Sequence, residues 1–216
     1  MSYDVCLFDL DGTIIDPRQG ITKSVQHALK LFGIHEETEN LLDFIGPPLR
    51  ESFTLKYNLK GLELENAILR YREYFASKGI FENTLYEGIV EGLVTLKDNG
   101  KLLMIATNKP RQYAISIIQN LNLEKYFSFI AGDDMDGGRT KYGKRDVILY
   151  AFKHVDVQRK LKSVMIGDRS HDILGAKQTG INSIGISWGY GSKEELLAAE
   201  ADYIVDTVTE LLQLLI

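Results

Sequence analysis

The sequence of 216 residues contains little cysteine and no long hydrophobic run. Its single cysteine, Cys6, cannot form an intramolecular disulfide, which argues against a disulfide-stapled scaffold and predicts a reducing compartment. The N-terminus lacks the basic and apolar regions of a signal peptide, and no apolar run is long enough to span a bilayer. We therefore expect a cytoplasmic protein that does not contact membranes.

The chain also lacks an excess of basic residues. Its formal net charge is −5, from 25 Lys and Arg against 30 Asp and Glu, with no dense basic block. Proteins that bind nucleic acids usually carry a basic excess or stripe, so we expect no nucleic-acid partner. The four histidines are scattered and suggest no metal cluster. A hydrophobic content of 44% and a charged content of 25% are ordinary for a globular protein.

Short, continuous apolar runs recur along the chain and predict buried strands. These runs cover residues 4–10, 101–108, 126–134, 162–168, 182–189 and 202–206. Helical patterns occupy residues 89–99, 111–122, 144–154, 171–179, 193–199 and 208–214. Strands that alternate with helices predict an α/β protein with a doubly wound, Rossmann-like parallel sheet.

One interval, from about residue 15 to residue 83, shows no convincing strand. Residues 20–34 and 64–79 each place apolar side chains on one helical face, and shorter helical pieces lie between them. The interval is far longer than a loop, so it should be a small all-helical domain with some core of its own. We expect an α/β core of residues 1–15 and 84–216, and a helical cap of residues 16–83 inserted after the first strand.

The segment FDLDGTIID, residues 8–16, places two aspartates where the first predicted strand ends. Asp-Gly is a common turn dipeptide, but the same pattern suits a metal site that contains a nucleophile. Ligands of open parallel sheets bind beyond the carboxyl ends of the strands, so other strand-end residues should lie in the same crevice. Those residues are Thr107, Asn108, Asp168 and Asp172, together with Lys141 or Lys144 before the helix that follows the third strand.

These residues together resemble the haloacid dehalogenase superfamily of phosphotransferases, and the resemblance spans essentially the whole chain. DLDGT matches the first motif, Thr107 the second, Lys144 the third and GDRSHD the fourth. The helical insertion resembles the cap that many members carry. FDLDGTIIDPRQGITKSVQHALKLFGI and FIGPPLRESF look like the phosphoglycolate phosphatase branch, particularly its 5′-nucleotidase-like members. Many members have Lys-Pro at the third motif, whereas Arg145 follows Lys144 here, so Lys141 stays open as the alternative lysine.

The resemblance implies a phosphatase that uses an aspartyl-phosphate intermediate. Asp9 would attack phosphorus, and Asp11 would protonate the leaving alcohol and then deprotonate the attacking water. Two like charges about 4 Å apart repel by roughly 4 kcal/mol at an effective dielectric constant near 20, so a carboxylate and a phosphate need compensating cations. Mg²⁺ suits this task. It would be held by Asp9, Asp168 and the Asp11 backbone carbonyl, the last of these by family resemblance.

The remaining site residues have supporting roles in this hypothesis. Thr107 and Lys144 would bind phosphoryl oxygens together with neighbouring backbone amides, and Asn108 is a further substrate-binding candidate. Gly12 would let the chain turn, and Thr13 would fix that loop. Two other residues complete the set: Asp172 would orient a metal-bound water or Lys144, and Arg50 in the cap could reach a second polar group of the substrate.

The expected activity is Mg²⁺-dependent hydrolysis of a small phosphorylated metabolite, of the phosphoglycolate phosphatase or 5′-nucleotidase type. Dehalogenases lack an acid at the position of Asp11, so Asp11 favours a phosphatase or a phosphomutase. A β-phosphoglucomutase-like mutase and a pyrophosphatase are the enzymatic alternatives. A receiver-type signalling module and a non-catalytic binding protein are the alternatives from other classes. The sequence identifies neither the metabolite nor the oligomeric state, which could be a monomer or a homodimer.

Overall fold

The computed structural model describes residues 3–135, 138–139 and 143–216, and the chain divides into two compact units. One unit comprises Met1–Asp16 and Leu85–Ile216, and the other comprises Pro17–Thr84. Each boundary lies one residue beyond the expected position. Two short strands, β2 (Ile15–Asp16) and β3 (Thr84–Leu85), form a separate two-stranded sheet where the chain passes between the units. We predicted no strand there, because a two-residue strand is too short to produce a hydrophobic pattern.

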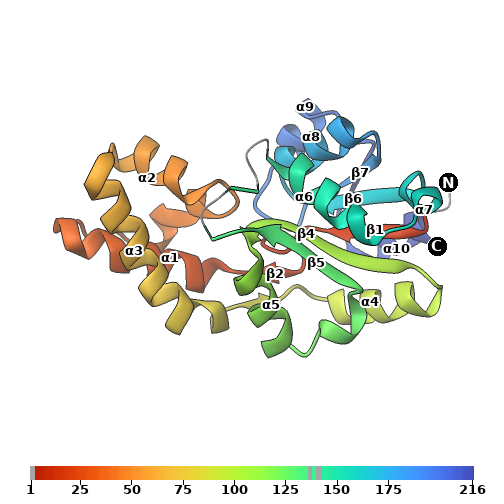
Figure 1. The fold of residues 1–216 in the computed structure, drawn as a ribbon, viewed down its shortest axis with the longest axis horizontal. Coiled ribbons are helices and arrows are strands. Elements are labelled where there is room, and N and C mark those ends of the chain that lie inside the picture. Colours follow the sequence, from red (N-terminus) through yellow and green to blue (C-terminus); the bar gives the residue numbers. More distant parts are fainter. Residues whose placement is uncertain (1–2, 136–137, 140–142) are drawn as a thin grey trace. The chain divides into compact units, whose positions relative to one another are not determined.

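The larger unit is built on a six-stranded sheet in which every strand pairing is parallel (Figure 1). Its strand order is β5-β4-β1-β6-β7-β8. The strands are β1 (Val5–Phe8), β4 (Leu102–Pro110), β5 (Phe129–Asp133), β6 (Ser163–Gly167), β7 (Asn182–Ile186) and β8 (Tyr203–Val205). Five of these strands lie within their predicted runs, and β4 extends two residues beyond its run. The predicted doubly wound α/β fold is confirmed.

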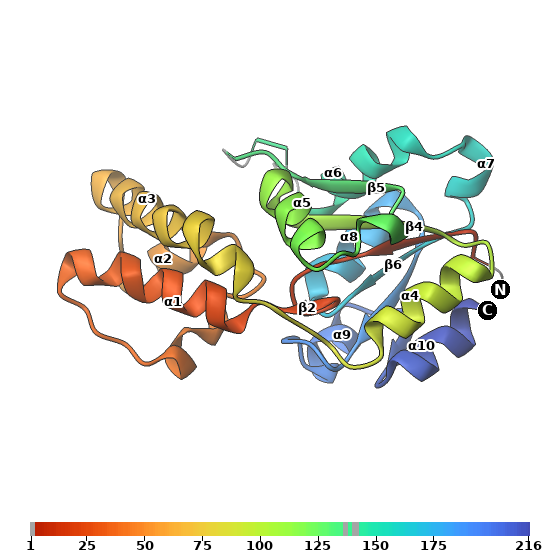
Figure 2. The same cartoon turned by 90° about the horizontal axis from the view of Figure 1, so that it is seen from below.

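Helices cover both faces of this sheet, with α4 and α5 on one side and α6 and α8 on the other (Figure 1). Figure 2 shows α10 beside α4, against which it packs. The helices are α4 (Ile89–Asp98), α5 (Arg111–Asn120), α6 (Lys144–Ala151), α7 (Val157–Lys160), α8 (Ser170–Thr179), α9 (Lys193–Ala198) and α10 (Val208–Leu215). The short helix α7 was not predicted, and the end of the predicted helix 144–154 is a 3₁₀ turn.

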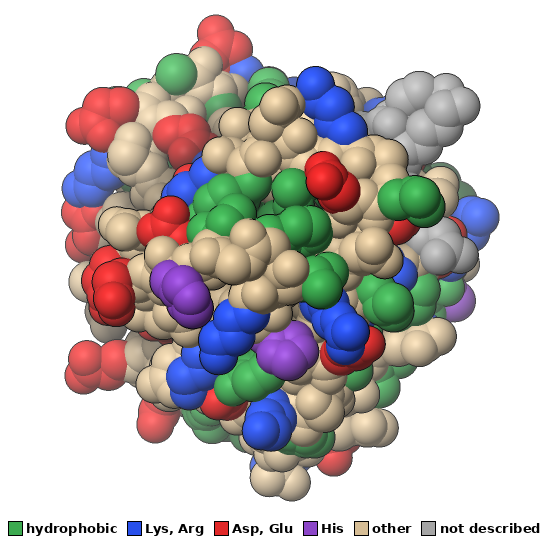
Figure 3. Space-filling model, turned by 90° about the vertical axis from the view of Figure 1, so that its left-hand side faces the viewer, with side chains coloured by type: hydrophobic (Ala, Val, Ile, Leu, Met, Phe, Trp, Pro, Cys, Tyr) green, Lys and Arg blue, Asp and Glu red, His purple; other side chains and the backbone are tan. Residues whose placement is uncertain are grey.

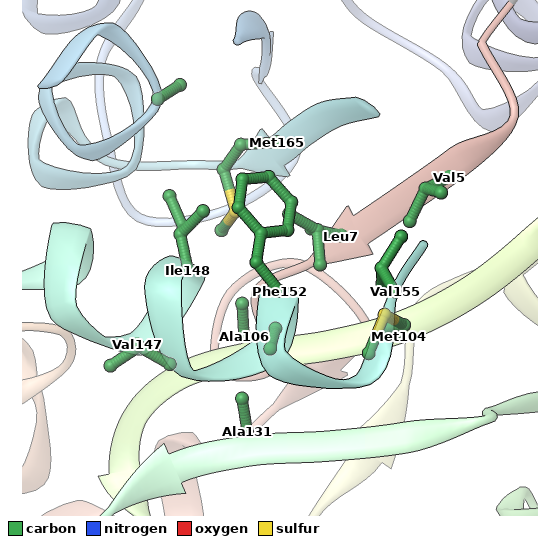
Figure 4. Close-up of a cluster of buried hydrophobic side chains, with 12 residues drawn as sticks. Val5, Leu7, Met104, Ala106, Ala131, Val147, Ile148, Phe152, Val155 and Met165 are labelled. Atoms are coloured by element: carbon green, nitrogen blue, oxygen red, sulfur yellow. The ribbon is translucent and has the colours of Figure 1, made fainter. Parts of the chain in front are cut away.

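A cluster of buried side chains lies between the sheet and α6 (Figure 4). Val5 and Leu7 of β1 point to the same face because side chains alternate along a strand, and Met104 of β4 joins them there. Ile148 and Phe152, in and just after α6, pack against this face. The same packing positions the C-terminal end of β1, which is followed by Asp9, and the N-terminus of α6, which begins with Lys144.

The smaller unit contains α1 (Arg18–Leu29), α2 (Leu49–Tyr57) and α3 (Gly61–Ser77), and α1 packs along α3. Phe44 and Phe53 meet edge to face with ring centroids 5.0 Å apart, so the unit has a hydrophobic core of its own. The space-filling view in Figure 3 shows acidic and basic side chains on one face around a group of hydrophobic ones. Among the described residues, no helix is both long and apolar enough to cross a membrane.

Candidate active site

Asp9 directly follows β1, in the middle of the sheet. Its backbone N–H donates to the Ile166 carbonyl of the neighbouring β6 at 2.9 Å, which extends the strand pairing by one step. The residue is only 5% exposed. The chain then turns at Gly12, whose φ of +83° is a left-handed conformation that favours glycine. A Cβ at Gly12 would lie 2.2 Å from Asp168 Oδ2, so glycine also permits the close approach of these two loops.

Lys144 brings three segments of the sheet edge together. Its Nζ lies 2.8 Å from Asp9 Oδ1 and 2.7 Å from Asp172 Oδ1, and it donates to the Ala106 carbonyl at 2.9 Å. The lysine side chain is fully buried. It is placed by the start of α6, while Asp172 is placed by the first turn of α8, where its Oδ2 accepts from the Arg169 backbone N–H. The structure thus places Asp172 in direct contact with Lys144.

These contacts set the charge states of Asp9 and Lys144. Burial by itself raises the pKa of Asp9, but the charges of Lys144 and His171 outweigh it, so the pKa lies below its usual value. Burial lowers the pKa of Lys144, but Asp172 and Asp9 outweigh that effect and raise it. Both groups are therefore ionised near neutral pH. An ionised carboxylate held in one orientation can act as a nucleophile.

Asp168 follows β6 and is buried with one carboxylate oxygen engaged and the other free. Its Oδ2 accepts from the Tyr190 backbone N–H at 2.8 Å, while Oδ1 has no hydrogen-bond partner among the described residues. Burial, with added repulsion from Asp172 and Asp9, raises the pKa of Asp168 to about 8. A buried carboxylate oxygen without a donor needs a cation or a proton.

Asp11 has a separate lysine partner, Lys109, which the sequence analysis missed. Lys109 Nζ lies 2.6 Å from Asp11 Oδ2, and the two side chains are 6% and 12% exposed. Burial raises the pKa of Asp11, and the charge of Lys109 only partly opposes this. Lys109 directly follows the second motif residues, and a lysine at a strand end facing an acidic crevice was the signal that could have revealed it.

Thr107 and Asn108 lie inside β4, which extends two residues beyond the predicted end. The pairing with β5 shifts register between Ala106 and Pro110, so these residues occupy an irregular part of the strand. Thr107 Oγ1 accepts from the Lys109 backbone N–H at 3.2 Å. Asn108 Oδ1 is buried without a hydrogen-bond partner among the described residues, as is Thr13 Oγ1. Such polar atoms can bind a ligand that the protein encloses.

The loop after β7 packs on both acidic loops, a role that the sequence analysis did not predict. Trp188 Nε1 donates to the Thr13 carbonyl at 3.1 Å, and the Tyr190 hydroxyl hydrogen-bonds to Asp16. A Cβ at Gly189 would lie 2.4 Å from Asp168 Cβ and 2.4 Å from the Gly12 carbonyl oxygen. Residues 187–191, called here the clamp loop, therefore hold the Asp168 and Gly12 loops in contact.

Arg50 and Lys141 were two further candidates from the sequence. Arg50 belongs to the helical unit, where its guanidinium forms a bidentate ion pair with Glu65 at 2.6 and 2.8 Å, and both side chains are about half exposed. Lys141 lies outside the described residues. Among the described residues, Lys144 is the lysine that contacts Asp9, at 2.8 Å.

The site is suited to a divalent cation. Among the described residues, Asp9, Asp11, Asp168 and Asp172 supply four carboxylates and direct ion-pair contacts bring two lysines, so two negative charges remain when all four acids are ionised. Oxygen donors favour hard cations such as Mg²⁺. Ligand atoms of Asp9, His171 and Asp172 lie within 4.8 Å of one another, but Lys144 already contacts both acids of that group and offsets one of their two negative charges. The free Oδ1 of Asp168 is thus the better-suited cation ligand.

Comparison with known proteins places this geometry in a family. Residues 6–186 match the family model described as haloacid dehalogenase-like hydrolase. A 5′-nucleotidase of Pseudomonas aeruginosa is 38% identical, over 100% of this chain and 96% of that protein. The tyrosine-protein kinase PtkA of Mycobacterium tuberculosis is 36% identical, over 96% of this chain and 67% of that protein. A phosphoglycolate phosphatase of Agrobacterium fabrum and a pyrophosphatase of Bacillus mycoides are among the more distant relatives, each at 28% identity.

The fold comparison agrees with the sequence relatives. A crystal structure of a proposed phosphatase from Clostridium difficile matches this chain with a TM-score of 0.90 and 46% identity, and the match covers 100% of both chains.

Proposed function

The chain belongs to the haloacid dehalogenase-like hydrolase family and is a phosphoric monoester hydrolase, and from this premise we propose that it hydrolyses small phosphomonoesters through an aspartyl-phosphate at Asp9, with Mg²⁺. The family expected from the motifs is confirmed. The observation that carries the proposal is the buried Asp9–Lys144 ion pair, at 2.8 Å, beside a second acid, Asp11, with its own lysine. This pairing keeps one carboxylate ionised for attack and leaves another to exchange protons.

In the first step, an Asp9 carboxylate oxygen attacks phosphorus and the bond to the ester oxygen breaks. The departing oxygen takes a proton from Asp11, so an alcohol leaves and Asp11 becomes a carboxylate. Lys144, Thr107 and nearby backbone N–H groups stabilise the charge on the phosphoryl oxygens. The lowered pKa of Asp9 and the raised pKa of Asp11 match these two roles.

In the second step, water releases the phosphate. Asp11 takes a proton from the water as the water oxygen bonds to phosphorus, and the bond between phosphorus and the Asp9 oxygen breaks. Inorganic phosphate leaves, Asp9 is again a carboxylate, and Asp11 is again protonated. Atoms and charges balance over the cycle, and no other reactant is needed.

Phosphatases of this family generally use a divalent metal, and we assign its binding to Asp9, Asp168 and the Asp11 backbone carbonyl. When bound, the cation supplies positive charge that draws the phosphate toward the carboxylates. Asp172 orients Lys144 through their 2.7 Å contact. The clamp loop orients Asp168 through the Tyr190 backbone N–H, which leaves the other oxygen of Asp168 for the cation.

The proposed substrates are nucleoside 5′-monophosphates, with phosphoglycolate as the second candidate. The first is supported by the 5′-nucleotidase relative, whose similarity extends over the whole of this chain, including the helical unit. The second is supported by relatives of lower identity.

A panel assay tests the proposal. Purified protein is given nucleoside 5′-monophosphates, phosphoglycolate, pyrophosphate and a hexose 1-phosphate, and released phosphate is measured with Mg²⁺ and with EDTA. We expect the highest kcat/KM for a nucleoside 5′-monophosphate and no release with EDTA. If pyrophosphate were the preferred substrate, the protein would be a pyrophosphatase instead. If the hexose phosphate were isomerised without release of phosphate, it would be a mutase. Full activity of the Asp9→Asn variant would show that Asp9 is not the nucleophile.

A further inference from the structure

The Lys109–Asp11 ion pair is a buried contact of the site to which the proposed reaction assigns no role. Lys109 Nζ lies 2.6 Å from Asp11 Oδ2, and both side chains are largely buried. Burying an ammonium group carries a desolvation cost, which a close carboxylate offsets. The pair therefore stays together in the folded protein, and the position of Lys109 decides how the Asp11 carboxyl is turned.

The two oxygens of Asp11 differ in their surroundings. Oδ2 contacts Lys109, whereas Oδ1 is buried and has no hydrogen-bond partner among the described residues. A carboxylic acid donates from the oxygen that carries its proton, and the oxygen beside an ammonium group can only accept. The geometry leaves Oδ1 as the oxygen that can hold a transferable proton.

We propose that Lys109 is a positioning residue for proton transfer, which holds Asp11 Oδ2 so that Oδ1 exchanges the proton with the ester oxygen. The inference rests on the proposed function, in which Asp11 protonates the leaving group. As the bond between phosphorus and the ester oxygen breaks, the electron pair stays on that oxygen, which takes the proton from Oδ1. Lys109 itself neither touches phosphorus nor exchanges a proton in this step.

The backbone supports this assignment. Lys109 follows Thr107 in the irregular end of β4, and its N–H donates to Thr107 Oγ1. Asp11 stands in the turn after β1, which is the sheet neighbour of β4. The pairing of β1 with β4 therefore brings Asp11, in the turn after β1, close to Lys109 at the end of β4.

The test compares esters whose leaving groups differ in their need for a proton. p-Nitrophenolate is a stable anion and leaves without protonation, whereas phenolate is more basic and benefits from an acid. The parameter kcat/KM reports the steps up to departure of the alcohol, so it isolates proton donation from the later attack of water. We expect Lys109→Met to lower kcat/KM for phenyl phosphate at least tenfold more than for p-nitrophenyl phosphate. Lys109→Arg, which keeps the cation, should restore most of this difference.

Four further variants make the outcome decisive. Asp11→Asn should show the same selective loss, and adding Lys109→Met to it should cause little additional selectivity, because both changes remove one function. Lys153→Met removes an exposed lysine that the proposed reaction does not use, and it should change neither substrate's kcat/KM. Lys109→Gln keeps a donor at the same place, and melting temperatures of all variants show whether they fold.

The role of Lys109 would be overturned if Lys109→Met and Lys109→Gln lowered kcat/KM equally for both esters while Asp11→Asn lowered it selectively. That result would leave the proposed function intact. Failure of the wild-type protein to release phosphate from either ester would instead overturn the proposed function. The two failures are therefore distinguishable in one set of measurements.

Discussion

Lys144 and Lys109 each contact a different aspartate of the Asp9–Asp11 pair, and the two aspartates have different chemical roles in the proposed reaction. Lys144 contacts Asp9 and Asp172, and the charges of Lys144 and His171 lower the pKa of Asp9 although burial alone would raise it. Lys109 contacts Asp11, whose pKa nevertheless stays raised. Two aspartates one residue apart thus differ in protonation because different strands and helices bring them different neighbours.

Lys144→Met should abolish most phosphate release and destabilise the fold. The change leaves Asp9 and Asp172 buried without their cation, and breaking a buried pair in this way costs roughly 3–5 kcal/mol. We expect kcat/KM to fall at least a hundredfold and the midpoint of urea unfolding to drop. Lys153→Met is the control for losing a lysine. An unchanged unfolding midpoint would contradict the ion-pair geometry.

The pKa of Asp168, about 8, predicts how metal affinity depends on pH. A metal binds the ionised carboxylate, so binding must release the proton that Asp168 holds below its pKa. Titration calorimetry with Mg²⁺ should show affinity rising by up to tenfold per pH unit between pH 6 and about 8, and levelling off above. Asp168→Asn should bind more weakly and lose this pH dependence. A wild-type affinity that is constant over this pH range would contradict the assignment.

The same raised pKa predicts a destabilising effect of Asp168 without metal. A carboxyl that binds its proton more tightly in the folded state favours folding below its unfolded pKa, and this benefit is lost as pH rises through about 8. In EDTA, Asp168→Asn should therefore unfold at a higher temperature than wild type at pH 8, with a smaller difference at pH 5. Adding Mg²⁺ should stabilise wild type more than the variant. A variant less stable than wild type at pH 8 in EDTA would contradict this account.

At the scale of elements, the clamp loop joins segments that are far apart in sequence. It connects the turn after β1, the turn after β6 and the short strand β2, through contacts to Thr13, Asp168 and Asp16. Gly189 lies where Asp168 and Gly12 meet, with no room for a side chain.

Gly189→Ala should displace Asp168 and weaken metal binding at least tenfold. The added Cβ would lie 2.4 Å from atoms of both loops, which is far inside van der Waals contact, so one loop must move. Titration with Mg²⁺ measures the effect. Gly100→Ala is the control, because a Cβ there meets nothing within 4 Å, although its positive φ makes any side chain strained. It should lower stability by about 1 kcal/mol and leave metal affinity unchanged.

The order of elements and the acids of the site could be predicted because both depend on short, local stretches of the sequence. Continuous apolar runs predict buried strands, and the fold rule that ligands bind at strand ends brings Asp9, Asp168 and Lys144 together. The Lys109–Asp11 pair was missed because the end of β4 is irregular in register, although a lysine at a strand end beside an acidic crevice was a signal for it. The clamp loop was missed because its contacts use backbone groups of Thr13 and Tyr190, which leave no pattern of side-chain types.

At the scale of the whole molecule, each unit has its own hydrophobic core. The core of the helical unit includes Phe53, which is fully buried and packs against Phe44, whereas the acids of the site all belong to the α/β unit. Stability of the helical unit and cation binding by the α/β unit should therefore respond to different substitutions.

Phe53→Ala should destabilise the helical unit by roughly 3–5 kcal/mol, because it leaves a cavity in a small core. Hydrogen exchange should speed up for amides of residues 17–84, while amides of the six-stranded sheet and the affinity for Mg²⁺ stay unchanged. Leu62→Ala, at a side chain that is 83% exposed, is the control and should alter neither. Equal loss of protection in both units would show that they unfold as one.

The central claim is that Asp9 becomes phosphorylated during hydrolysis. The most direct test traps the phosphorylated enzyme. The Asp11→Asn variant is mixed with substrate and Mg²⁺ and quenched in acid within one turnover, and its peptides are mapped by mass spectrometry. Loss of the proton acceptor Asp11 slows hydrolysis of the phosphorylated intermediate, so that it accumulates. A nitrophenyl ester allows the first step without an acid. The account predicts a phosphate on Asp9 that is absent when Asp9→Asn is combined with Asp11→Asn. Phosphate release by wild type with no phosphorylated Asp9 in the trapped enzyme would contradict it.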